Sequence, residues 1–135
     1  MKIVILERNS VGTDVSVDCI GNYGDVTIYR NTTAEDVAEK VQEAEIIIAN
    51  KAPLNAETLK NAPDVKLICE FATGFDNCDL DYLSGRGIRV ANVRNYSTDM
   101  VAQHTFTLAL ALMQKLAHYD TYVKSGEYSA QDRFS

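Results

Sequence analysis

Five short runs of apolar, mostly β-branched residues recur along the first two thirds of the chain and limit the folds it can adopt. They occupy residues 2–6, 26–29, 45–49, 65–69 and 88–91. Apolar side chains on consecutive positions suit strands that are covered on both faces, as in parallel sheets. Helix patterns open at Thr33, Asn55 and Asp79 between these runs. The alternation predicts an α/β fold, with an open parallel five-stranded sheet, right-handed crossovers and helices on both faces.

The last third of the chain departs from this alternation. Residues 98–118 predict one long helix, and its apolar side chains cover more than one narrow stripe. They belong to Val101, Phe106, Leu108, Leu110, Leu112, Met113 and Leu116. A helix that is apolar nearly all round needs partners on several sides, and one small sheet covers only one of them. We therefore expect this helix to bridge to a further part of a longer protein.

Composition and charge indicate which classes of binding partner this protein is not expected to have. The 135 residues include 13 Lys and Arg against 19 Asp and Glu, a formal net charge of -6. This balance argues against a nucleic-acid partner, because a phosphate backbone needs a basic surface. No apolar run approaches the roughly 20 residues of a membrane span, and the charged N-terminus does not suit a signal peptide. The three cysteines lack metal-like spacing, so we expect a cytoplasmic protein with reduced thiols and no metal or membrane partner.

The segment after the fourth apolar run carries the most informative pattern. Residues 71–79 read FATGFDNCD and join a predicted strand to a predicted helix, which is where open parallel sheets bind ligands. Gly74 lacks a Cβ, so its backbone can turn tightly and bring N–H groups close to an anion such as a small carboxylate. The alternative is an ordinary turn in which Asp76 or Asn77 caps the following helix.

Two further residues are expected at the same edge of the sheet. Lys51 follows the third apolar run and should lie beside Gly74, where its cation can complement the same carboxylate; a solvated loop lysine is the alternative. Tyr96 follows the fifth run and offers a hydroxyl to a substrate oxygen, with packing as the alternative. Ser97 or Thr98 is expected to cap the long helix.

Motifs for cofactor phosphates and for nucleophilic catalysis are absent from the sequence. Gly85-Arg86-Gly87 resembles the start of a dinucleotide fingerprint. It follows a predicted helix and precedes a predicted strand, whereas the fingerprint needs a strand, then glycines, then a helix. His104 suits a structural hydrogen-bond partner better than a catalyst, because no nucleophile lies near it in sequence.

Three blocks follow one another in the second half of the chain. They are GFDNCD at residues 74–79, GIRVAN at residues 87–92, and YS followed by VAQH within residues 96–104. In order and spacing they resemble the GxDNxD, GIxVxN and YS…VAEH segments of D-2-hydroxyacid dehydrogenases, with Gln103 where Glu is common. The resemblance implies a flavodoxin-like substrate-binding domain over residues 1–97. Residues 98–135 would form an interdomain helix and the start of a linker to an NAD-binding domain further along a longer chain.

The resemblance also implies substrate-binding residues. The backbone N–H groups of Thr73 and Gly74 would bind the substrate carboxylate, and Lys51 would add a cation to that site. Tyr96 aligns with a tyrosine that contacts substrate in lactate-type members. The implied substrates are small 2-keto or D-2-hydroxy acids of the hydroxypyruvate, glyoxylate or pyruvate type.

The implied activity is that of an oxidoreductase that transfers a hydride between NAD(H) and these acids, with NADP(H) also open. Met100 and Val101 would lie where the cleft wall approaches the nicotinamide. The family's catalytic Arg, Glu and His belong to the nucleotide-binding domain, so no catalytic residue is expected in this chain. The fragment alone is expected to be inactive, and the complete protein to be a homodimer.

Two other functions compete with this interpretation. A free-standing flavodoxin-like ligand-binding module is the alternative, because residues 9–13 after the first strand contain hydroxyls and a glycine that can cradle a phosphate. A phospho-receiver domain on the same fold would need an Asp at the end of the third strand, where this chain has Asn50 and Lys51.

Overall fold

A computed structural model describes residues 1–132 of the chain. It contains two compact units, the first from Met1 to Arg94 and the second beginning at Asn95. The last three residues of the expected segment 98–135 lie outside the described residues.

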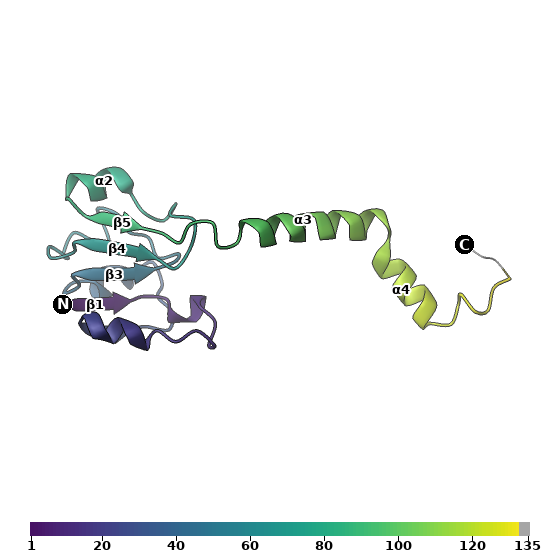
Figure 1. Cartoon of the computed structure of the whole chain (residues 1–135). Coiled ribbons are helices and arrows are strands. Elements are labelled where there is room, and N and C mark those ends of the chain that lie inside the picture. Colours follow the sequence, from purple (N-terminus) through teal and green to yellow (C-terminus); the bar gives the residue numbers. More distant parts are fainter. Residues whose placement is uncertain (133–135) are drawn as a thin grey trace. The chain divides into compact units, whose positions relative to one another are not determined.

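The first unit is built on a five-stranded sheet in which all neighbouring strands run parallel. The strands are β1 (Lys2–Ile5), β2 (Asp25–Ile28), β3 (Ile46–Ala49), β4 (Leu67–Glu70) and β5 (Arg89–Ala91). Their order is β2-β1-β3-β4-β5, which is the flavodoxin-like order. The labelled strand arrows in Figure 1 point the same way, so the carboxyl ends gather at one edge. The expected α/β fold is confirmed.

Both faces of the sheet bury apolar side chains, because successive residues of a strand point to opposite faces. The helical elements of this unit are η1 (Arg8–Ser10), η2 (Asp18–Tyr23), α1 (Val37–Lys40) and α2 (Leu80–Gly85). On one face, Val4 packs in a core with Val37 of α1 and Leu83 of α2. On the other face, Ile3 packs in a smaller cluster with Ile20 of η2.

The helix expected from Asn55 is present only as a series of turns. The Asn55 carboxamide oxygen accepts hydrogen bonds from the N–H groups of Glu57 at 3.0 Å and Thr58 at 3.1 Å. Asn55 therefore caps the first turn, as expected for the start of a helix. Leu59 then bonds four residues back to Asn55, but Ala62 bonds only three residues back to Leu59. A three-residue spacing tightens the last turn and interrupts the α-helical ladder.

The second unit consists of α3 (Thr98–Met113) and α4 (Leu116–Lys124). The expectation of one continuous helix over residues 98–118 is wrong, because Lys115 adopts a left-handed conformation with φ 49° and ψ 40°. Its N–H bonds three residues back to Leu112, which ends the α3 ladder. The sequence gives no warning of this break, since lysine is a good helix former and rarely adopts positive φ.

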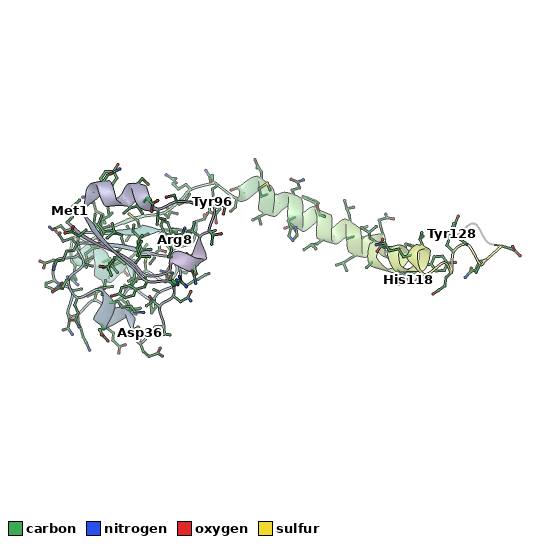
Figure 2. The ribbon with its side chains drawn as sticks, turned by 90° about the horizontal axis from the view of Figure 1, so that it is seen from below. Met1, Arg8, Asp36, Tyr96, His118 and Tyr128 are labelled. Atoms are coloured by element: carbon green, nitrogen blue, oxygen red, sulfur yellow. The ribbon has the colours of Figure 1, made fainter. Side chains whose placement is uncertain are left out.

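The apolar side chains of α3 are exposed within their own unit. Phe106 is 71% exposed, Leu112 80% and Met113 76%. Figure 2 shows side chains projecting from the α3 ribbon along its length. This exposure agrees with the sequence pattern, in which apolar residues are not confined to one stripe. Within residues 1–132, no helix combines the length and apolarity needed to cross a membrane.

Two isoleucines allow a test of the core. Ile47 in β3 is fully buried, whereas Ile28 at the end of β2 is 49% exposed. We expect Ile47→Ala to lower the free energy of unfolding by about 2–5 kcal/mol, because it removes buried methyl groups and leaves a cavity. The matched change Ile28→Ala should cost much less. Urea unfolding followed by far-UV circular dichroism measures both, and equal losses would contradict the burial described for β3.

Candidate functional site

The loops after β3 and β4 meet at the carboxyl edge of the sheet. Ala49 pairs with Glu70 across the two strands, so Lys51 and the Thr73–Gly74 pair follow strand ends that are neighbours. The loops are also bonded directly to each other, since Leu54 N–H donates to the Asn77 carbonyl at 2.9 Å. Lys51, Thr73 and Gly74 are all exposed. The structure therefore brings these three predicted residues to one exposed edge of the first unit.

The loop after β4 is held through its carbonyl groups. The Asn92 carboxamide donates to the Thr73 carbonyl at 2.7 Å, and Val93 N–H donates to the Ala72 carbonyl at 2.9 Å. In the described part of the chain, the N–H groups of Thr73 and Gly74 donate to no protein acceptor. Two adjacent open N–H groups on a fixed loop can bind an anion without further rearrangement.

Gly74 contributes to this loop differently from the sequence expectation. Its φ is not in the left-handed region, and a Cβ built on it would meet only Asp76 Oδ2, at an ordinary 3.6 Å. The backbone therefore does not require glycine for a tight turn. What glycine provides is an unobstructed approach to the N–H groups, because it has no side chain beside them.

The helix cap at this edge is also displaced from the expected positions. The Asp79 side chain, rather than that of Asp76 or Asn77, caps α2 by accepting the Tyr82 N–H at 3.1 Å. Asn77 instead links the two loops, because its carboxamide donates to the Ala52 carbonyl and to Glu70 Oε1, both at 3.0 Å.

Glu70 is a buried carboxylate close to the candidate site, and the sequence reasoning missed it. It is 2% exposed and lies at the carboxyl end of β4, below the Thr73–Gly74 loop. Its Oε1 accepts from Asn77 and from the Cys78 thiol at 3.1 Å, while its Oε2 has no partner among the described residues. The available signal was a charged residue two positions after Ile68, on the same buried face of the strand.

Cys78 is a hydrogen-bond donor rather than a nucleophile in this arrangement. Burial, the hydrogen bond to Glu70 and the negative charge of Glu70 together raise the pKa of the Cys78 thiol to about 12. A thiol with so high a pKa stays protonated near neutral pH, and nucleophilic attack requires the thiolate.

The remaining predicted site residues belong to the second unit. Tyr96 is 64% exposed, and Met100 and Val101 are 67% and 60% exposed in the first turn of α3. Ser97 occupies the N-cap position of α3 but makes no side-chain cap hydrogen bond. No Thr98 side-chain bond is present in the described residues either, so the expected hydroxyl cap is wrong. These positions leave the side chains of Tyr96, Met100 and Val101 open to contacts outside their own unit.

The glycines at residues 85–87 take no part in a phosphate loop. Gly85 ends α2, and Gly87 has a positive φ of 72° in the turn before β5. The order is helix, turn, strand, which is the reverse of a dinucleotide-binding element. Residues 85–87 therefore form a helix-to-strand turn rather than a phosphate-binding loop.

Residues 3–134 match the sequence model of a protein family, the catalytic domain of D-isomer specific 2-hydroxyacid dehydrogenases. The chain belongs to this family. Glycerate dehydrogenase of Methylorubrum extorquens is 37% identical over 134 residues, which cover 98% of this chain and 42% of that protein. Glyoxylate reductase of Thermococcus litoralis is 35% identical over 95 residues, which cover 70% of this chain and 29% of that protein. This dehydrogenase-family chain thus spans less than half the length of these relatives.

Solved structures agree with the family assignment. The D-lactate dehydrogenase of Aquifex aeolicus, in complex with NAD and lactic acid, superposes with a TM-score of 0.77 at 29% identity, over 98% of this chain and 39% of that one. An acyclic imino acid reductase in complex with NADPH and D-Arg shares the fold, with a TM-score of 0.80 at 24% identity over 93% of this chain and 41% of that one.

The cysteines provide a test of the polar cluster below the loop. Cys19 is exposed and Cys78 is buried. At pH 8 we expect iodoacetamide to alkylate Cys19 first and Cys78 far more slowly, because the raised pKa of Cys78 leaves almost no thiolate. Peptide mass mapping measures both rates, and urea-unfolded protein is the control in which the difference should disappear. Equal rates in the native protein would disprove the donor role of Cys78.

Proposed function

We propose that this chain is the substrate-anchoring part of an NAD(P)-dependent D-2-hydroxyacid dehydrogenase. The observation that carries the proposal is the pair of open N–H groups at Thr73 and Gly74, beside Lys51, at the carboxyl edge of a sheet in a chain of this family. The Ala72 and Thr73 carbonyls already accept hydrogen bonds, whereas the Thr73 and Gly74 N–H groups remain unused donors. Donors beside a cation suit a carboxylate.

The proposed role of the chain is to hold the substrate in place. The Thr73 and Gly74 N–H groups bind the carboxylate, Lys51 adds a positive charge, and the Tyr96 hydroxyl donates to a substrate oxygen. Fixing the carboxylate orients the neighbouring C2 carbon and lowers the entropic cost of reaching the transition state. No residue of this chain is assigned a proton-transfer role.

The cofactor supplies the chemistry of hydride transfer when it is bound. Met100 and Val101 are exposed apolar side chains at the start of α3, and they suit a wall against a planar nicotinamide ring. NAD is the proposed cofactor and NADP fits these two residues equally well. The groups that hold the phosphates, and the acid–base residue, belong to the part of the complete protein beyond this chain.

The proposed substrates are small 2-keto acids and their D-2-hydroxy acids, of the hydroxypyruvate, glyoxylate or pyruvate type. The names of the relatives at 37% and 35% identity, a glycerate dehydrogenase and a glyoxylate reductase, support this size class. Two N–H donors and one lysine provide for a single carboxylate, which is what a small 2-keto acid carries.

The proposed organisation divides the chain close to, but not at, the boundary between the two compact units. Residues 1–97 form the substrate-binding domain, and residues 98–135 form the interdomain segment that leads to the NAD-binding domain. The exposed apolar side chains of α3 support a bridging role. We propose that the complete protein is a cytoplasmic homodimer.

The proposal can be tested with the complete protein and with the 135-residue chain. We expect the complete protein to oxidise NADH or NADPH in the presence of glyoxylate, hydroxypyruvate or pyruvate, measured by the loss of absorbance at the nicotinamide band. The 135-residue chain alone should show no turnover, because we assign no phosphate-binding loop and no acid–base residue to its described part. Failure of the complete protein with all three acids would refute the substrate class.

Two substitutions in the complete enzyme test the site residues. Lys51→Ala and Tyr96→Phe should each raise KM for the keto acid by roughly tenfold, since each removes one polar contact to substrate. KM for the nicotinamide cofactor should change little. Lys60→Ala, at another exposed lysine, is the matched control. An equal rise in both KM values would assign Lys51 and Tyr96 to the fold or to domain closure instead.

A further inference from the structure

Three successive backbone N–H groups after β3 converge on one carboxylate oxygen. The N–H groups of Asn50, Lys51 and Ala52 donate to Glu7 Oε2 at 2.8, 2.8 and 3.0 Å. Consecutive N–H groups that point at one place form an anion-binding concavity. Here the anion comes from the chain itself, from a residue two positions after the end of β1.

The residues before and after Glu7 are both hydrogen-bonded to neighbouring segments, which holds Glu7 in position. Leu6 N–H donates to the Ile48 carbonyl of β3 at 2.9 Å, and Arg8 N–H donates to the Tyr29 carbonyl beyond β2 at 3.0 Å. The Glu7 carbonyl in turn accepts from the N–H of Ser10 at 2.9 Å and from its hydroxyl at 2.7 Å. The sheet thus fixes the backbone of Glu7, and the carboxylate then fixes the loop.

The same loop is also held at its far end. Ala52 is 3% exposed, and its carbonyl accepts from the Asn77 carboxamide at 3.0 Å. Asn77 belongs to the loop that carries Thr73 and Gly74. Lys51 therefore lies between two anchors, one from β1 and one from the neighbouring loop, while its own side chain remains exposed.

The contact with Glu7 determines which polar group of Lys51 is available to bind a ligand. Its backbone N–H already donates to Glu7, so only the side-chain ammonium can meet a ligand. A long lysine side chain loses rotamer freedom when it binds. Fixing the backbone of Lys51 leaves fewer positions for its ammonium and so lowers that cost.

We propose that Glu7 is a positioning residue for Lys51, which it holds over the substrate carboxylate by binding the three N–H groups of residues 50–52. This inference rests on the proposed function, because it takes the carboxylate to bind beside Lys51. Glu7 acts through the loop and does not touch substrate.

The test uses Glu7→Gln in the complete enzyme, which keeps the shape of the side chain and removes its charge. Hydrogen bonds to a charged acceptor are about twice as strong as those to a neutral one. We therefore expect KM for the keto acid to rise roughly three- to tenfold, with KM for the nicotinamide cofactor unchanged. Glu35→Gln, at an exposed glutamate, is the matched control and should have no effect.

A double-mutant cycle separates positioning from a general structural role. In the Lys51→Ala background there is no ammonium left to position, so Glu7→Gln should add little to KM for the keto acid. A rise in KM as large as in the wild-type background would overturn the inference, because Glu7 would then act independently of Lys51.

Amide hydrogen exchange tests the contact itself, without reference to activity. The amides of Asn50, Lys51 and Ala52 should exchange faster in Glu7→Gln than in the wild type, while those of β4 should not change. Unchanged exchange at all three amides would overturn the inference. If Lys51→Ala leaves KM for the keto acid unaltered, the proposed carboxylate site fails and this inference fails with it; if only Glu7→Gln has no effect on KM, the inference alone fails.

Discussion

β3 and β4 pair in parallel with Ala49 opposite Glu70, and the features at the carboxyl edge depend on that register. It places the loop that carries Lys51 beside the loop that carries Thr73 and Gly74. The bond from Asn77 to the Ala52 carbonyl is possible only because the two strands end together. A shift by one residue would turn the Glu70 side chain to the opposite face of the sheet. The register therefore fixes both the exposed site and the buried polar contacts beneath it.

The two loops at this edge satisfy their backbone groups in opposite ways. The loop after β3 has its N–H groups bound by the internal carboxylate of Glu7. In the loop after β4 the Ala72 and Thr73 carbonyls are bound, and the N–H groups of Thr73 and Gly74 remain open in the described part of the chain. Buried or half-buried donors without acceptors are costly, but these two lie at an exposed edge where a ligand can reach them. Of these two loops, the loop after β4 therefore has N–H groups free to bind an external anion.

The second unit has a different physical character. The first unit buries its apolar residues on both faces of a sheet, whereas Phe106, Leu112 and Met113 of α3 remain exposed within their unit. Helices of this length gain most of their stability from packing of an apolar face. The proposed interdomain role supplies such packing, and it agrees with a chain that spans 42% of a glycerate dehydrogenase relative.

The sequence by itself determined the parallel α/β fold and the family, and it predicted the edge at which the proposed site lies, because apolar strand runs and the GFDNCD segment act locally and in a fixed order. It predicted that Lys51 and Gly74 follow neighbouring strand ends, since neighbouring parallel strands end at one edge. Only the tertiary structure showed the left-handed Lys115, the cap at Asp79, the buried Glu70 and the contact of Glu7 with residues 50–52. The contact of Glu7 joins residues 43 to 45 positions apart, and such pairing depends on how the strands assemble rather than on any local pattern.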